Sequence, residues 1–268
     1  DAFVAPEAPV DLTRVMVGSE GTLGFVTAAT VGLVPLPAAK ALVTLEFEHL
    51  LDALEATPRV LAHGPSAVEV MDDFILGHAV GHPTLDAALR QIVSGPRPSL
   101  LCVEFYGEHL DALVPRMQAL ERDLAAAGIR CAARHLTDAV SQARVWHVRE
   151  SSLGLSMGMK GDGKAISFVE DTAVPPDRLR DYISRFQQVV ARRGTAAGVY
   201  AHASVGCLHV RPVINLKSAE GLAQFEAVRQ SAAWVLLQNA WFCAWLAFTL
   251  NSCAYTTEIF AGALRATP

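Results

Sequence analysis

Short runs of apolar and β-branched residues alternate with longer amphipathic runs between residues 41 and 198, and this alternation limits the possible folds most strongly. Strands are expected at residues 41–47, 67–71, 99–106, 130–135 and 164–173, and helices at residues 50–61, 110–127, 137–152 and 175–193. Pro58 is expected to break the first helix. Two further extended pieces are expected on either side of Gly206. The repeated β-α-β order predicts an α+β domain, with an antiparallel sheet and helices on one face.

Charge and cysteine usage exclude several classes of protein. The 22 basic residues are outnumbered by 27 acidic ones, and the net charge of −5 provides no basic field for nucleic acid. The five cysteines are scattered and form no C-x-x-C pair, so neither a disulfide framework nor a zinc ribbon is indicated. His78 and His82 are expected in a surface loop, because no cysteine or acid stands near them at ligand spacing. A reducing compartment fits this composition best.

A glycine-spaced segment, VGSEGTLGFVT at residues 17–27, stands near the start of the chain. Its three glycines allow a tight turn and a close approach of the backbone to a ligand. An apolar strand is expected directly after the turn. On spacing alone, a tight connection between strands is favoured over a cofactor-binding turn.

The sequence of residues 11–37 resembles the end of the flavin domain of FAD-linked oxidases of the vanillyl-alcohol oxidase type. The resemblance lies in GSEGTLG, followed by VTAATVGLVPLP. That family includes glycolate oxidases, D-lactate dehydrogenases and D-2-hydroxyglutarate dehydrogenases. The resemblance implies a remnant of an FAD-binding domain at residues 1–38 and a ferredoxin-like cap domain, which covers the substrate, at residues 39–229. It implies flavin contacts at Gly18, Ser19, Glu20, Gly21, Thr22, Gly24, Phe25 and Val26. Phe25 and Ala28 depart from the residues common in the family.

A tryptophan and an arginine share one face of the helix expected at residues 137–152. Trp146 and Arg149 are three positions apart, and a guanidinium beside an aromatic wall is a good receptor for a carboxylate. On sequence alone an ordinary Arg–Glu helix pair is favoured. The W-x-x-R-E sequence resembles the family motif whose arginine holds the substrate carboxylate, so the resemblance implies that Trp146 and Arg149 bind substrate.

A second match, YAHASVGCLHVRP at residues 200–212, resembles the G-H-x-x-x-G-x-L-H segment whose histidines bind a divalent metal in the same flavoenzymes. His202 and His209 are seven positions apart, so an unbroken strand would place them on opposite faces. Only a turn or bulge near Gly206 can bring both to one ion. Imidazole suits zinc, iron or manganese. From the residues alone, two core or interface histidines are the alternative.

The resemblance implies hydride transfer from a small 2-hydroxy acid to FAD, with a quinone or an iron–sulfur protein as electron acceptor. In the family a later S-G-E-H-G-D-G segment supplies the base, and the first half of the flavin domain carries the pyrophosphate. Neither is present in this sequence. We therefore expect an incomplete oxidoreductase that does not turn over, with a catalytically silent cap domain as the alternative.

The last part of the chain has a different character, because residues 230–257 include no charged residue. Their length and aromatic content approach those of a membrane span. Residues 241–268 resemble a helix of amino-acid ABC transporter permeases. We interpret the chain as an oxidoreductase interior joined to a permease fragment near residues 231–238, with a permease component of an amino-acid importer as the alternative function. Residues 1–229 are expected in the cytoplasm, and the apolar helical tail at 230–268 can associate with the inner membrane.

Overall fold

A computed structural model describes residues 16, 19, 22–95 and 98–237. The chain divides into two compact units, Asp1–Leu36 and Pro37–Pro268. In the first unit, residues 24–36 form neither helix nor strand, and Phe25 is 98% exposed. The apolar strand expected after the glycine turn is therefore wrong for this structure. A strand requires ladder hydrogen bonds to a neighbour, and residues 24–36 make none within the described part of the chain.

The second unit is built on one antiparallel sheet, which confirms the predicted α+β class. The strands are β1 (Ala39–Phe47), β2 (Ala67–Met71), β3 (Ser99–Gly107), β4 (Ala132–Leu136), β5 (Lys164–Ala165), β6 (Val169–Ala173), β7 (Ala197–His202) and β8 (Cys207–Ile214). Their order is β4-β1-β3-β2-β7-β8-β5, and β6 also pairs with β8. The first four strands follow the β-α-β, β-α-β order read from the sequence, which is the ferredoxin-like arrangement.

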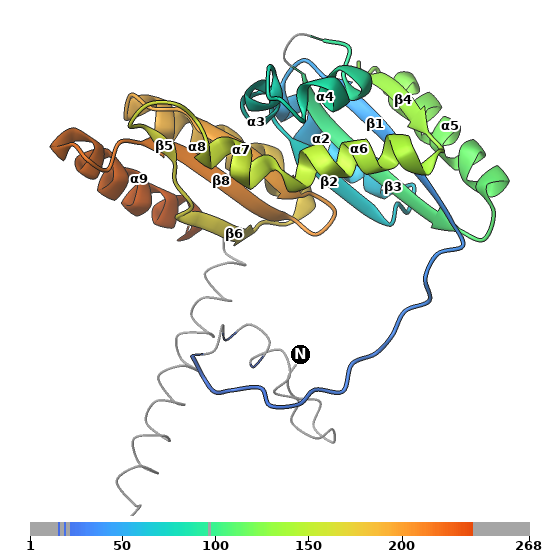
Figure 1. Ribbon diagram of the computed structural model, residues 1–268, viewed down its shortest axis with the longest axis horizontal. Coiled ribbons are helices and arrows are strands. Elements are labelled where there is room, and N and C mark those ends of the chain that lie inside the picture. Colours follow the sequence, from blue (N-terminus) through green and yellow to red (C-terminus); the bar gives the residue numbers. More distant parts are fainter. Residues whose placement is uncertain (1–15, 17–18, 20–21, 96–97, 238–268) are drawn as a thin grey trace, which may run out of the picture. The chain divides into compact units, whose positions relative to one another are not determined.

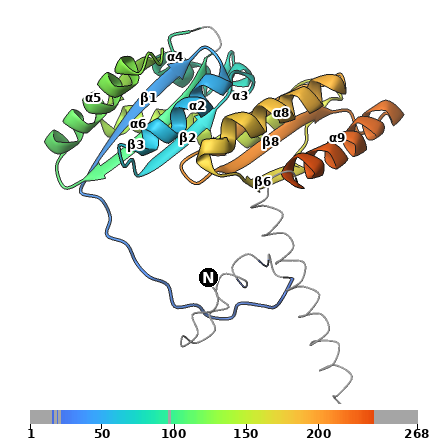
Figure 2. The same ribbon diagram turned by 180° about the vertical axis from the view of Figure 1, so that it is seen from behind.

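Helices cover both faces of this sheet, so the expectation of helices on one face is wrong (Figures 1 and 2). One face carries α2 (Leu50–Leu61), α5 (Leu110–Ala126) and α8 (Leu179–Arg192), and the other carries α3 (Asp73–Ala79), α4 (Asp86–Ile92), α6 (Ala139–Glu150) and α7 (Ser152–Met157). Strand β1 shows the reason, because residues 41–47 are all buried and its side chains point to both faces.

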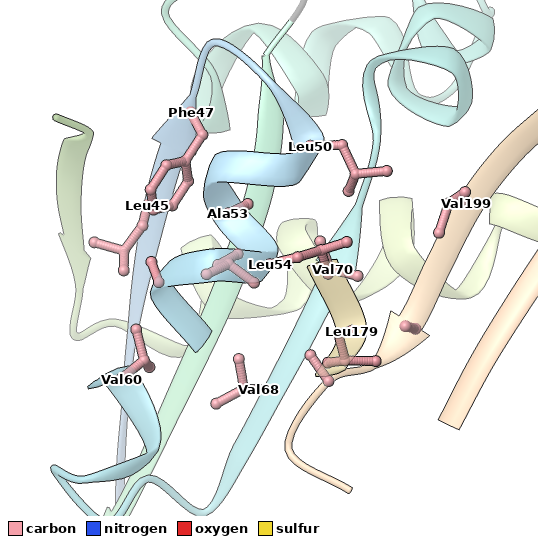
Figure 3. Packing of buried hydrophobic residues seen from close by; sticks show 14 of the residues in the cluster. Leu45, Phe47, Leu50, Ala53, Leu54, Val60, Val68, Val70, Leu179 and Val199 are labelled. Carbon is pink, nitrogen blue, oxygen red and sulfur yellow. The ribbon is translucent and has the colours of Figure 1, made fainter. Parts of the chain in front are cut away.

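The larger core lies between the sheet and α2, α5 and α8. Leu45, Phe47, Val68 and Val70 from the strands pack against Leu54 of α2 (Figure 3). Each buried aliphatic side chain of this kind contributes about 1.5–3 kcal/mol relative to exposure. Helix α9 (Ala219–Leu237) packs beside α8 and β8. The larger core and helices α8 and α9 therefore support the hairpin of β7 and β8.

Three local expectations are corrected by the structure. Pro58 lies inside α2 without breaking it, because one turn from the helix end it removes only a single helical hydrogen bond. His78, expected in a loop, lies in α3, whereas His82 does lie in the connection between α3 and α4. The strand expected at residues 164–173 is two strands, β5 and β6, which both pair with β8, and the pairing of β6 shifts register between Val169 and Thr172.

Asp72 ties α3 to the central sheet. Its carboxyl accepts the N–H of Ile75 at 2.8 Å as the cap of α3, and the N–H of Val199 in β7 at 2.6 Å. The side chain is fully buried, and burial raises its pKa to about 8 despite the two backbone donors. One carboxyl thereby fixes a helix start and the position of β7.

Replacing Asp72 by alanine is expected to lower the free energy of unfolding by about 2–4 kcal/mol, because the helix cap is lost and the buried N–H of Val199 has no acceptor. Urea unfolding at neutral pH measures this loss. Asp138→Ala removes a cap on α6 through the same contact to Ser141, but on an exposed side chain, and is the matched control. An equal loss in both variants would contradict the role given to Val199.

The raised pKa of Asp72 also predicts a pH dependence. The folded pKa of about 8 exceeds the unfolded value of 3.8, so this group's contribution is complete below 3.8 and is lost as pH rises toward 8. Asp72→Asn cannot titrate and should show a shallower fall in unfolding free energy across that range, whatever its absolute stability. Asp138→Asn should keep the wild-type slope. A wild-type slope in Asp72→Asn would contradict the assignment.

Candidate functional site

The site begins with the tight hairpin between β7 and β8. Gly206 adopts a positive φ of 72°, and a Cβ at this position would lie 1.7 Å from the carbonyl oxygen of Val174. The Gly206 carbonyl in turn accepts the N–H of Val174 at 2.8 Å. The turn therefore requires glycine for its conformation and for its space. It is the turn that the spacing of the two histidines demands.

The register of the hairpin gathers side chains on one face of the sheet. Tyr200 pairs with His209, and His202 pairs with Cys207. Because alternate residues share a face, all four side chains lie on the same side. The ring centroids of His202 and His209 are 5.1 Å apart, with the rings nearly perpendicular. The reversal of direction at the turn thus brings together two histidines that an unbroken strand would separate.

Each of these histidines has a carboxylate partner. His202 Nδ1 lies 2.7 Å from Glu69 Oε1, and Glu69 is directly opposite His202 in the register of β2 and β7. His209 Nδ1 lies 3.0 Å from Glu170 Oε1 in β6. A carboxylate accepts but does not donate, so both Nδ1 atoms carry the ring proton. In the neutral form of each ring the lone pair is then on Nε2, and this is the nitrogen that can bind a metal ion.

Arg149 reaches this face from α6. Its Nε donates to Glu69 Oε2 at 2.9 Å, and its Nη2 lies 2.7 Å from the same oxygen in an ion pair that leaves both side chains nearly buried. The guanidinium also lies 4.7 Å from the centre of the Tyr200 ring. The partner of Arg149 is thus a residue of the sheet rather than Glu150 on its own helix. Trp146, on the same helix, packs against the second core cluster.

A second arginine also contacts Tyr200, at its hydroxyl group. Arg211 of β8 is 2% exposed, donates from Nη2 to Glu170 Oε1 at 2.6 Å, and donates to the Tyr200 hydroxyl. Its guanidinium carbon lies 5.3 Å from the Tyr200 ring centre. Tyr200 therefore contacts two cations, of which Glu69 pairs with Arg149 and Glu170 with Arg211. Both arginines and both glutamates are therefore paired with each other, and the histidines are the members of the network that remain to bind a ligand.

The protonation of the site follows from burial. Burial lowers the pKa of His209 below its usual value, more than Glu170 and Asp171 raise it, and the charge of Arg149 acts in the same direction as burial. A neutral imidazole is the form that ligates a metal. Burial raises the pKa of the Cys207 thiol, and Asp171 and Glu170 add to this effect. In the absence of a cation, Cys207 is therefore a thiol.

Several residues of this network lie outside the residues predicted for the site. Glu69 is the clearest case, because its partner His202 is 133 positions away in sequence. A glutamate between two core valines in the strand AVEVM is the one signal that could have identified it. Tyr200 and Arg211 lie within the histidine motif itself, two positions from His202 and His209 respectively.

The predicted flavin segment is described only in part. Gly18, Glu20 and Gly21 lie outside the described residues. Ser19 donates to the Met16 carbonyl at 2.8 Å, and the Thr22 hydroxyl donates to the Ser19 carbonyl at 2.6 Å, so a local turn is present. Phe25 and Val26 expose 98% and 69% of their surface. The flavin contacts predicted for Gly24, Phe25 and Val26 stay predictions.

An open groove of about 400 Å³ lies between α3, α4 and the residues after α4. It is lined by Leu76, Val80, Leu89, Arg90 and Ser94, among others. None of the residues of the histidine network lines it. The groove is therefore separate from the chemistry of the β7–β8 face.

An antiparallel sheet with helices on both faces carries the paired-histidine hairpin, and comparison with known proteins assigns this chain to a class. The family model for FAD linked oxidases, C-terminal domain, matches residues 36–237, and the chain belongs to that family. It is 31% identical over 230 residues to the D-2-hydroxyglutarate dehydrogenase of Pseudomonas putida, an alignment that covers 83% of this chain and 23% of that protein. The chain thus spans about a quarter of that relative.

The fold likeness extends to a solved structure of alkyldihydroxyacetonephosphate synthase, with a TM-score of 0.55 at 14% identity. That likeness covers 87% of this chain and 47% of the other. At this identity it shows the fold alone. The resemblance of the chain to FAD-linked oxidases is therefore confirmed by the family model and the sequence relatives, and the solved structure supports the fold.

The permease resemblance of the tail is confirmed over a short stretch. The arginine ABC transporter permease protein ArtM of Haemophilus influenzae is 52% identical over 48 residues, which are 18% of this chain and 21% of that protein. Within the described residues, no helix is both long and apolar enough to cross a membrane. The predicted apolar tail lies outside the described residues beyond Leu237, and its membrane contact stays a prediction.

Replacing Gly206 by alanine should lower the free energy of unfolding by more than the strain of its positive φ alone would cause. Gly128→Ala, at a φ of 73° with open space around the new methyl group, is the matched control and should cost roughly 1 kcal/mol. Gly206→Ala should cost about 1–3 kcal/mol more, because the methyl group collides with the Val174 carbonyl. Denaturant unfolding compares the two. Equal losses would show that the close approach at Gly206 is not needed.

Proposed function

We propose that this chain carries the substrate-side domain of an FAD-dependent dehydrogenase that oxidises a small 2-hydroxy acid. The observation that carries the proposal is the convergence of Arg149 and the pair His202 and His209 on one face of β2, β7 and β8, joined through Glu69. A cation for the carboxylate beside two metal-ligating nitrogens for the adjacent hydroxyl matches the two polar groups of a 2-hydroxy acid.

Arg149 is the group that binds the substrate carboxylate in this proposal. A guanidinium carries five N–H donors, and the hydrogen bond to Glu69 uses the Nε donor. The Tyr200 ring and Glu69 restrict the orientation of the guanidinium, so little conformational entropy is lost when an anion binds. Trp146, three positions earlier on the same helix and packed against the second core cluster, is assigned the role of excluding water from the anion.

The histidine pair fits a divalent metal ion. Glu69 and Glu170 hold the Nδ1 protons, so the Nε2 lone pairs of His202 and His209 are free to coordinate zinc, manganese or iron. A metal ion bound there supplies Lewis-acid polarisation of the 2-hydroxyl. The carboxylates orient the imidazoles and hold each ring proton on Nδ1, on the side away from the ion. The donor set provides two protein ligands and leaves other positions for the substrate.

The exposed segment of the first unit supports a cofactor contact. Residues 24–36 form no ladder hydrogen bonds, and Phe25 and Val26 present apolar surface. Backbone groups in this state are available to a bound FAD, which supplies the hydride acceptor. The relatives named D-2-hydroxyglutarate dehydrogenase favour a 2-hydroxy dicarboxylic acid as substrate, with electrons leaving the flavin for a quinone or an iron–sulfur partner.

Calorimetric titration of the Mn²⁺-loaded chain with D-2-hydroxyglutarate tests the proposal. Arg149→Lys keeps a positive charge for Glu69 but loses the planar fork, so the dissociation constant is expected to rise about tenfold or more. Arg116→Lys is the matched control, because Arg116 also stacks on an aromatic ring, 4.8 Å from the centre of Phe105 in the other core. No binding by the wild type, or unchanged binding by Arg149→Lys, would contradict the proposal.

A further inference from the structure

Two further potential ligands, Asp171 and Cys207, lie beside His209. Asp171 Oδ1 lies 3.3 Å from His209 Nδ1, and Cys207 Sγ lies 3.9 Å from the same Asp171 oxygen. The ligand atoms of these three residues all lie within 4.8 Å of one another. Asp171 comes from β6, while Cys207 and His209 come from β8. A carboxylate, a thiol and an imidazole from two adjacent strands thus face one point in space.

The separations match those around a tetrahedral zinc ion. Bonds of about 2.0–2.1 Å to nitrogen and oxygen, at tetrahedral angles, place those two ligands about 3.3 Å apart. A bond of about 2.3 Å to sulfur places sulfur and oxygen about 3.6 Å apart. The observed distances of 3.3 Å and 3.9 Å lie close to both values. Small rotations of exposed side chains suffice to close the difference, since Asp171 is 67% exposed.

The backbone at Asp171 is arranged to reach this point. Asp171 has a positive φ of 51°, and the register of β6 against β8 shifts between Val169 and Thr172. A non-glycine residue in this conformation costs free energy, of order 1–3 kcal/mol. The irregularity turns the Asp171 carboxylate toward Cys207 and His209 instead of leaving it in the regular ladder.

We propose that Asp171, Cys207 and His209 form a second cation site that takes a thiophilic divalent ion such as Zn²⁺, and that its occupation inhibits the metal site at His202 and His209. The inhibitory part rests on the proposed function, because the two sites share His209. One neutral imidazole has one lone pair. An ion on Nδ1 therefore moves the ring proton to Nε2, and Nε2 can no longer coordinate the ion shared with His202.

The proton balance of this step is simple. The Cys207 thiol loses its proton to solvent when sulfur binds the ion, and the His209 proton moves from Nδ1 to Nε2. Glu170 then loses the hydrogen bond from His209 but keeps the one from Arg211 at 2.6 Å. The carboxylate is therefore not left without a partner, and the exchange is compatible with the rest of the network. Thiolate favours zinc over manganese, so the two sites differ in metal preference.

The first arm of the test uses Co²⁺, which gives a thiolate charge-transfer absorption in the near ultraviolet when sulfur is a ligand. The wild-type chain is expected to show this band, and Cys207→Ser and Asp171→Asn should lose it or weaken Co²⁺ binding about tenfold or more. Cys131→Ser is the control, because Cys131 is a partly buried thiol outside the cluster. A band that persists in Cys207→Ser and disappears in Cys131→Ser would overturn the proposal.

The second arm separates the two sites by measuring bound Mn²⁺ by electron paramagnetic resonance during a Zn²⁺ titration. Zn²⁺ should displace Mn²⁺ at one equivalent from the wild type and only at about tenfold or more higher concentration from Cys207→Ser. His202→Ala should lose Mn²⁺ binding but keep the Co²⁺ thiolate band. Mn²⁺ displacement that is unchanged in Cys207→Ser would overturn the inhibitory site and leave the histidine pair intact. Absence of Mn²⁺ binding in the wild type would instead remove the proposed function, while the thiolate band alone would sustain the second site.

Discussion

The antiparallel register between β7 and β8 is the constraint on which the rest of the site depends. It places Tyr200 opposite His209 and His202 opposite Cys207, and no other register puts all four side chains in these pairs. A shift by one residue would send alternate side chains into the core formed by Val199, Leu208 and their neighbours. The turn at Gly206 fixes this register, and the core packing beneath the strands penalises any slip.

Buried charges give the site its orientation. The pair of Arg149 and Glu69 is nearly buried, and such a pair contributes little net stability but is costly to break. Its role here is geometric, because Glu69 also orients His202, and Arg149 lies on Tyr200. Glu170 performs the corresponding role for His209 and Arg211. Two carboxylates therefore determine which nitrogen of each imidazole faces the open side of the sheet.

The local sequence pattern predicts the strands well and the layers less well. The strand at residues 67–71 agrees with β2 to the residue, because valines and a methionine alternate between turn signals. Coverage of both faces could not be predicted. The polar residues of β1, Thr44 and Glu46, suggest that one face of the strand is exposed to solvent, but both are buried. Glu46 accepts hydrogen bonds from the backbone N–H groups of Ser94 and Gly95. Helices of seven residues, such as α3 and α4, are too short to show a clear period.

The sequence predicts those parts of the candidate site whose residues are close together in the chain, but not the contacts between residues far apart in the chain. The two histidines and the turn between them lie within one motif, and Arg149 with Trp146 lies within another. Glu69 joins these motifs from a strand 80 residues before Arg149. Such pairings depend on the strand order, β2 beside β7, which a single sequence does not reveal. The Cys207 and Asp171 contact depends in the same way on the irregular pairing of β6 with β8.

The central claim is that Glu69 and Glu170 hold the ring proton of His202 and of His209 on Nδ1, so that Nε2 is the nitrogen left to coordinate a metal ion. The most direct measurement is the ¹⁵N chemical shift of each ring nitrogen at neutral pH in the metal-free chain, by long-range correlation to the ring carbons' protons. The account predicts a protonated Nδ1 and an unprotonated Nε2 in both rings. Protonation of Nε2 in either ring, or of both nitrogens, would contradict it.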